Sequence, residues 1–227
     1  MSQLNPASNW HPRVIVGAPT GSLNPRVPSP VYRPSPVALE IADGIGFGID
    51  GESLIVAGQG KDGTFEMTGH LADGTFPQRD FKVTRQGDET RVDGYYGWQS
   101  YDMQRNGSTT EIHGLDANYS SSVTENGASI TTSGKFPSQQ FNITANGDDV
   151  TVGNPVDNYN AKIHYAPDKI TVTGSVPEQC FEITPTPDGF HVKGDYRFQD
   201  FDVVRSKNGG FTIQGLYPQQ KYVVTPQ

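Results

Sequence analysis

The stretch FEITPTPDGFHVKGDYRFQD, Phe181 to Asp200, contains the unit that decides the fold. It begins with an aromatic and an aliphatic residue two positions apart, passes a Pro-Asp-Gly turn, and continues through Val192 and Gly194 to Gln199. Similar units recur from about residue 58 to residue 227. A fixed period of this kind indicates one supersecondary unit that is stacked many times.

The most regular residue of the unit is a glycine, and successive anchor glycines are separated by 16, 20, 20, 20, 19, 21, 20 and 21 residues. An aromatic residue usually follows seven positions later, and an aliphatic residue or methionine two positions after that. The unit from 153 to 173 deviates, and Ile163 restores its pattern if one residue is inserted. The anchor glycines are Gly58, Gly74, Gly94, Gly114, Gly134, Gly153, Gly174, Gly194 and Gly215.

Apolar residues alternate on both arms of each unit, which predicts two strands that each have one apolar face. We place the residues two positions after the glycine, such as Tyr96 and Tyr196, on that inward face. Asn-Gly and Asp-Gly pairs between the arms favour tight hairpins, because they supply positive backbone angles. We expect the glycine to make room for an aromatic side chain of the next strand, or to let the strand coil. A glutamine five residues after the glycine, as in Gln199, can satisfy backbone groups of the second connection.

These features predict an all-β fold, a meander of antiparallel β-hairpins with about 20 residues per two-stranded unit. Its sixteen to twenty strands should form a curled or rolled sheet, because a one-sided apolar face cannot stay exposed along its length. A β-solenoid with one rung per unit is the first alternative, and a propeller is the second. Residues 37 to 57 should form hairpins that start the sheet, with turns at Asp43-Gly44 and Asp50-Gly51.

Two resemblances accompany this pattern. Through Tyr101-Asp102, Phe201-Asp202 and the two-strand period, the units resemble bacterial YD-repeat shells, whereas Phe81-Lys82 and Phe141-Asn142 depart from that motif. The Ser/Pro-rich N-terminus is similar in composition to the export leaders of bacterial type III effectors. The resemblances imply a bacterial, secreted repeat protein.

The chain divides at residue 36. Residues 1–36 contain eight prolines, which exclude a helix or a paired strand of useful length, so we expect a disordered or extended leader before a β-repeat domain at 37–227. The competing interpretation is a strap that binds a partner or the chain's own sheet. The residues of the leader that would make such contacts are Trp10, Val14, Ile15, Val16 and Tyr32.

The charge and composition of the chain limit the kinds of partner and ligand that it can bind. A net charge of −8 argues against nucleic acid, and no apolar run is long enough to insert in a membrane. Without a secretory signal the chain would be cytoplasmic, or exported by another route. Cys180 is the only cysteine, and the histidines lack ligand spacing, so we expect no metal and no cofactor.

No motif in the sequence brings a nucleophile, a base and an oxyanion donor together. The sequence therefore predicts a protein that is not an enzyme. Its first functional interpretation is a scaffold that binds a protein partner through its sheet surface. A structural or adhesive subunit that self-associates is the alternative, and a carbohydrate-binding or carbohydrate-active protein is the second. Aromatic density and the one irregular stretch select the candidate contact residues, which are Tyr95, Trp98, Asp157, Asn158 and Tyr159.

Overall fold

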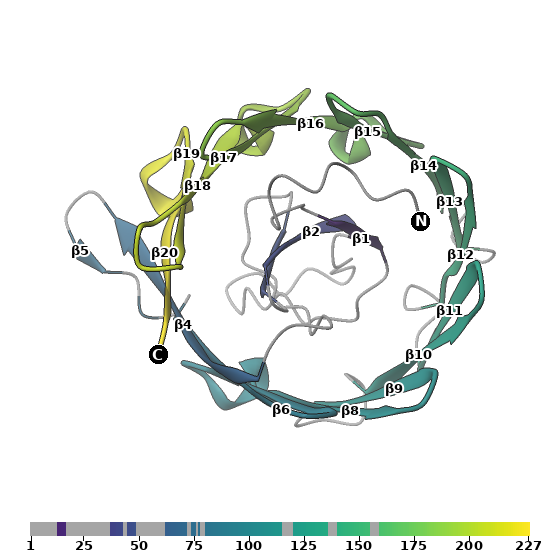
Figure 1. The fold of residues 1–227 in the computed structure, drawn as a ribbon, viewed down its shortest axis with the longest axis horizontal. Helices are drawn as coiled ribbons and strands as arrows, with labels where there is room; N and C mark the ends of the chain where they lie inside the picture. Colours follow the sequence, from purple (N-terminus) through teal and green to yellow (C-terminus); the bar gives the residue numbers. More distant parts are fainter. Residues whose placement is uncertain are drawn as a thin grey trace.

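The computed structural model describes residues 13–16, 37–42, 45–48, 62–71, 74–75, 77, 80–114, 120–135, 140–154 and 159–227. Within them the chain is all-β: antiparallel strands follow one another as hairpins, and the only helices are single 3₁₀ turns. Figure 1 shows the strands arranged as a ring. The predicted meander of hairpins is confirmed.

Sixteen of the described strands, β4 and β6 to β20, close into a barrel. Each pairs with its neighbours in sequence, and the last strand returns to the first: β20 pairs with β4 over six positions, from Lys221↔His70 to Pro226↔Phe65. The two-residue β5 pairs with β4 and lies outside the ring, because β4 also pairs directly with β6. The rolled sheet is therefore fully closed, and both the solenoid and the propeller are wrong. The short β5 is Gly74–Thr75. The sixteen barrel strands are β4 (Gly63–Leu71), β6 (Phe81–Gln86), β7 (Glu89–Gly94), β8 (Tyr101–Asn106), β9 (Thr109–Gly114), β10 (Ser121–Asn126), β11 (Ser129–Gly134), β12 (Asn142–Asn146), β13 (Asp149–Asn154), β14 (Tyr159–Tyr165), β15 (Ile170–Gly174), β16 (Phe181–Thr186), β17 (Gly189–Gly194), β18 (Phe201–Arg205), β19 (Phe211–Gly215) and β20 (Lys221–Pro226).

Alternation along the strands divides the wall into two faces. In β16, Phe181 and Ile183 are buried, whereas Glu182 and Thr184 are exposed. A sheet that closes on itself shields only its inner face, so the apolar set faces the lumen and the polar set faces outward. Ile163 is also buried, as the one-residue insertion in its unit predicts. Five aromatic residues of the repeat, at the inward positions seven and two residues after the anchor glycines, are predicted to be core: Phe141, Phe181 and Phe201 are buried, but Phe81 and Tyr96 are only partly so.

Tight turns join the strands at one end of the barrel. Gly107, Gly127 and Gly147 are the first residues of two-residue turns and have φ of 61°, 61° and 62°, as the Asn-Gly pairs predict. The Asp188-Gly189 pair behaves differently. Its turn is made by residues 187 and 188, and Gly189 already pairs in β17. There a β-carbon would clash with the carbonyl of Val203, so close approach of β18 explains this glycine.

A separate three-stranded sheet contains β1 (Arg13–Val16), β2 (Val37–Ala42) and β3 (Ile45–Gly48). Figure 1 shows β1 and β2 inside the ring of barrel strands. The hairpin predicted after residue 37 is thus present, but it does not start the barrel sheet. The leader also contains a short paired strand, because no proline interrupts residues 13–18.

Candidate functional site

The longer connections all lie at the end of the barrel opposite the tight turns, because the strands alternate in direction. We call this end the rim. Its four described 3₁₀ turns share one construction, in which a glycine ends a strand and a glutamine ends the turn. The turns are η2 (Gly97–Gln99), η5 (Pro177–Gln179), η6 (Arg197–Gln199) and η7 (Pro218–Gln220).

The glutamine side chain folds back on the strand end. Gln199 is fully buried, and its Oε1 accepts a hydrogen bond of 3.0 Å from the backbone N–H of Tyr196. The same bond from Tyr217 to Gln220 measures 3.2 Å. The anchor glycine leaves the space that this amide occupies, because a β-carbon on Gly194 would lie 2.6 Å from Cδ of Gln199. The amide role of the glutamine is confirmed, and the expected aromatic neighbour of the glycine is replaced chiefly by this glutamine.

This turn brings apolar side chains to the surface. Tyr196 and Tyr217 were expected on the inward face, but the strands end at the glycine and both residues are 38% exposed. They precede the 3₁₀ turns, where the two-residue alternation no longer applies. The inward assignment of these residues is therefore wrong.

Three consecutive connections, around η5, η6 and η7, gather these side chains on one part of the rim. Tyr196 stacks on Phe198 with ring centroids 5.4 Å apart. Gln220 Nε2 donates a 2.6 Å hydrogen bond to the carbonyl oxygen of Phe198, which ties neighbouring connections together. We call this surface the rim patch, and it contains Val176, Tyr196, Phe198, Leu216 and Tyr217.

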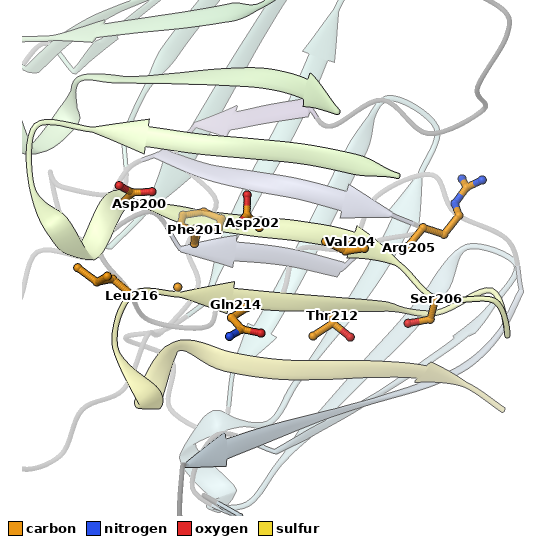
Figure 2. A pocket seen from close by; sticks show the side chains of 10 residues that line it. Asp200, Phe201, Asp202, Val204, Arg205, Ser206, Thr212, Gln214 and Leu216 are labelled. Carbon is orange, nitrogen blue, oxygen red and sulfur yellow. The ribbon is translucent and has the colours of Figure 1, made fainter. Parts of the chain in front are cut away.

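An open groove of about 450 Å³ continues from the rim patch along the outer face of β18 and β19 (Figure 2). Leu216 and Asp200 lie at its rim end, and Arg205 and Ser206 lie at the hairpin end. Between these two ends, the outward positions carry acidic, apolar, hydroxyl and amide side chains. We call this the outer groove, and its lining residues are Asp200, Phe201, Asp202, Val204, Arg205, Ser206, Thr212, Gln214, Gly215 and Leu216.

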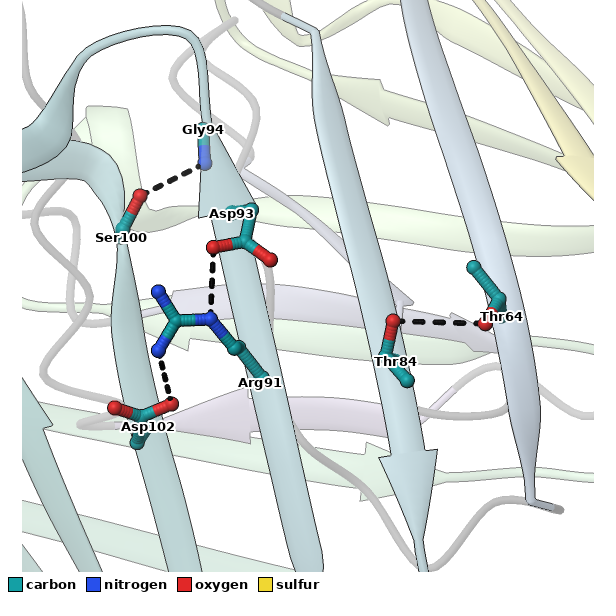
Figure 3. Close-up of polar contacts among 7 residues, drawn as sticks. All are labelled: Thr64, Thr84, Arg91, Asp93, Gly94, Ser100 and Asp102. Carbon is teal, nitrogen blue, oxygen red and sulfur yellow. Dashed lines mark hydrogen bonds and ion pairs between the residues drawn. The ribbon is translucent and has the colours of Figure 1, made fainter.

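Two aspartates give the rim end of the outer groove negative charge. His191 lies between them, with Nδ1 2.8 Å from Asp202 and Nε2 3.4 Å from Asp200. A similar contact of one side chain with two aspartates occurs on another part of the wall. There Arg91 contacts Asp102 at 2.8 Å and Asp93 at 2.9 Å (Figure 3).

The recurrence of this contact bears on the role of these residues in the wall. In both places a side chain with a ring or guanidinium nitrogen lies opposite an aspartate of the next strand, at His191↔Asp202 and Arg91↔Asp102. Recurrence at the same register is expected of cross-strand polar pairs that stabilise a wall.

Hydrogen bonding and burial explain the resolved pKa shifts. The bond to Asp102 raises the pKa of Arg91, and the bond to Glu182 raises the pKa of Lys169. A hydrogen bond with His164 lowers the pKa of Asp149, and Lys162 adds to the effect. Burial raises the pKa of Tyr101, whose ring packs near Val83 and Val92.

The sequence-predicted contact residues are only partly described. Tyr95 is 60% exposed on the connection between β7 and β8 and lies edge-to-face with Tyr96, 4.9 Å between centroids. Trp98 lies in η2 and Tyr159 begins β14, but the side chains of both are outside the described residues, as are Asp157 and Asn158 entirely. In the leader, Val14, Ile15 and Val16 form β1, and Trp10 and Tyr32 are outside the described residues.

The strand ends that flank the two connections carrying these residues are not neighbours on the rim. One connection joins β7 to β8, and the other joins β13, which ends at Asn154, to β14, which begins at Tyr159. Both connections belong to the rim. Six strands, β8 to β13, separate them, which is roughly 29 Å along the wall at about 4.8 Å per strand. Sequence reasoning missed the rim patch, although the aromatic-Pro-x-Gln pattern of Tyr217 to Gln220 marks a turn that would have revealed it.

No family model, curated protein or solved structure matches this chain. Among the described residues no helix is long and apolar enough to cross a membrane. Within the same part of the chain, no group of three or more His, Cys, Asp or Glu residues is placed to hold a metal ion.

Proposed function

We propose that this chain is a non-enzymatic binding protein that holds an extended segment of a protein partner across the rim patch and the outer groove. One observation carries the proposal. Of the six large apolar side chains that are exposed in the described residues, five lie in rim connections and four of these in the rim patch. They are Tyr95, Val176, Tyr196, Leu216 and Tyr217, and the sixth is Val204 in the outer groove.

Exposed apolar side chains that gather on one surface favour protein contact, and tyrosine is a frequent energetic centre of such contacts. The remaining outer wall carries charged and hydroxyl side chains, as in β16. A hydrogen bond from Gln220 to the backbone of Phe198 ties two connections of the rim patch together. A surface that is ordered before binding loses less conformational entropy on binding.

The closed wall defines how a partner can bind. β20 pairs with β4, so the barrel offers no unpaired strand edge to which a peptide strand could add. Recognition must therefore use side chains. From Asp200 to Ser206 the outer groove is about 20 Å long, at ~3.4 Å per residue, which suits about six residues of extended peptide.

The charges give this segment a direction. Asp200 and Asp202 favour a basic residue near the rim, and Arg205 favours an acidic residue near the hairpin end. Val204 would contact an apolar side chain between these charged ends, and Leu216 would contact one beside the basic residue at the rim end. The proposed partner is thus an extended segment with a basic end, an apolar middle and an acidic end.

The test uses a peptide library displayed on phage and selected on the immobilised full chain. Fluorescence anisotropy then measures the affinity of a selected peptide for wild type and for the double variant Leu216→Ser/Tyr217→Ser. We expect the double variant to lose about tenfold or more in affinity. Tyr95→Ser, on the same rim but outside the patch, is the matched control and should bind as wild type does.

Combined substitution of Asp157, Asn158 and Tyr159 tests the competing location. Loss of affinity there, with Leu216→Ser/Tyr217→Ser unaffected, would place the contact where the sequence alone suggested. A mass in size-exclusion chromatography that rises with concentration, and falls in Leu216→Ser/Tyr217→Ser, would instead make a second copy the partner. Failure to select any peptide, together with binding of the same chain to a glycan array, would overturn the proposal.

A further inference from the structure

The inner face of the barrel is buried around the whole ring. Met103 and Ile112, in β8 and β9, are 5% and 4% exposed, and Val192 and Ile213, in β17 and β19, are fully buried. Thr132 in β11 is buried as well. Burial on all sides requires that something fills the lumen.

The wall cannot fill the lumen alone. Sixteen strands at about 4.8 Å each give a circumference of roughly 77 Å and a diameter of at least about 24 Å before strand tilt widens it. Facing sheets pack about 10 Å apart, so each wall fills only about 5 Å with its side chains. A central space of roughly 14 Å or more remains, and an apolar wall facing water across it would be unstable.

The fold places a candidate in this space. β1 and β2 lie within the ring when the barrel is viewed along its axis (Figure 1). Seen through the wall from the side, violet strands lie behind the barrel strands and at their height (Figures 2 and 3). A sheet in the middle of the lumen would have wall strands at least about 12 Å away on either side, slightly more than the ~10 Å spacing of packed sheets.

We infer that the lumen is a binding site whose ligand is the chain's own N-terminal sheet, β1 to β3. The strand sequences RVIV, VALEIA and IGFG suit an apolar chamber, since they contain only two charged residues. These two, Arg13 and Glu40, are register partners across β1 and β2. Opposite charges in one register row offset each other, which lowers the cost of placing them in the lumen.

The connection to the barrel makes this sheet a separable ligand. It forms no strand pairs with the wall, because the three-stranded sheet and the barrel are distinct sheets. Only residues 49–62 join β3 to the barrel strand β4. No strand pairing therefore ties β1, β2 or β3 to the wall, and we expect the chain to hold the sheet even when that connection is cut. This inference concerns the lumen and does not depend on the rim patch.

The experiment inserts a site for a specific protease between Ala57 and Gly58 of the full chain. After cleavage in native buffer, size-exclusion chromatography should recover the N-terminal fragment with the barrel in one peak, and denaturant should separate them. A control site inserted after residue 5, before β1, should release its short peptide under native conditions. Separation of the 1–57 fragment without denaturant would overturn the inference.

The charge pair supplies a second measurement. In the cleaved chain, Arg13→Glu places two carboxylates in one register row. The fraction of the 1–57 fragment that stays with the barrel should therefore fall severalfold. The exchange Arg13→Glu/Glu40→Arg restores opposite charges and should restore retention. Equal retention in all three chains, or a loss that the exchange does not repair, would show that the sheet is not held in the lumen in this register.

Discussion

Gly194 and Gln199 fit together as one structural device: the glycine lacks the side chain that would occupy the place of the glutamine amide. The fully buried amide in turn accepts the N–H of Tyr196 at 3.0 Å. The same glycine–glutamine pair occurs at residues 94 and 99, 174 and 179, and 215 and 220. The anchor glycine and the glutamine of the repeat therefore depend on each other, because substitution of either residue disturbs the same turn.

Gly194→Ala should destabilise the barrel by about 1–3 kcal/mol, since the new methyl group overlaps a buried side chain that cannot move into solvent. Urea denaturation followed by tryptophan fluorescence measures the change. Gly153→Ala is the matched control: its β-carbon would lie 3.6 Å from Oδ1 of Asn160, an ordinary contact. Equal effects of the two substitutions would contradict the spatial explanation.

Gln199→Ala should cost about 1–3 kcal/mol, because the backbone N–H of Tyr196 loses its buried acceptor. The double variant Gly194→Ala/Gln199→Ala removes the two closest contacts of the new methyl group at residue 194, those with Oε1 and Cδ of Gln199, and keeps the contact with Cβ at 2.8 Å. Its destabilisation should therefore be smaller than the sum of the two single effects. A double-variant cycle by urea denaturation measures this coupling, and strict additivity would mean that the two residues act independently.

Much of the wall could be read from the sequence, because its rules are local. The alternation in Phe181 to Thr184 fixes the buried face of β16, and Asn-Gly pairs fix the turns at Gly107, Gly127 and Gly147. Closure could not be read in this way. The pairing of β20 with β4 joins the two ends of the barrel sheet, and a period of two is the same in open and closed sheets.

The site was harder to predict because its side chains lie where the period changes. Extending the alternation of β17 past Gly194 assigns Tyr196 to the core, yet a 3₁₀ turn begins at Arg197 and has its own period. Tyr95, by contrast, directly follows the strand-ending Gly94 and is 60% exposed. Turn chemistry at the rim overrides strand periodicity.

Phe181→Ala should destabilise the barrel by about 3–5 kcal/mol, because the ring is 3% exposed and its loss leaves a cavity in the wall's apolar layer. Tyr196→Ala removes a ring of similar size that is 38% exposed and should cost clearly less. Thermal and urea denaturation compare the two variants. A cost for Phe181→Ala no greater than that for Tyr196→Ala would mean that the inner face is loosely packed.

Asp149 should titrate below its ordinary range, because the hydrogen bond with His164 at 2.9 Å and the nearby Lys162 favour its charged form. A depressed folded-state pKa stabilises the fold above the unfolded pKa of the carboxyl, and this contribution is lost as pH falls through the folded pKa. NMR titration of the Asp149 side chain should show its pKa rising in His164→Gln. An unchanged pKa in that variant would remove His164 as the main cause.

A disulfide across the seam tests the closure of the barrel. Val223 of β20 and Thr68 of β4 are register partners, and such partners have α-carbons about 4.5–5.5 Å apart, within the range that a disulfide spans. In a Cys180→Ser background, Thr68→Cys/Val223→Cys should therefore oxidise readily, and the cross-link should raise stability by up to about 4–5 kcal/mol, because it closes a very long loop. Mass spectrometry of tryptic peptides detects the bond. Thr68→Cys/Thr212→Cys is the control, because β19 pairs with β20 and not with β4, so its cysteines should stay reduced. An open sheet would leave both pairs reduced, and that result would contradict the closed barrel.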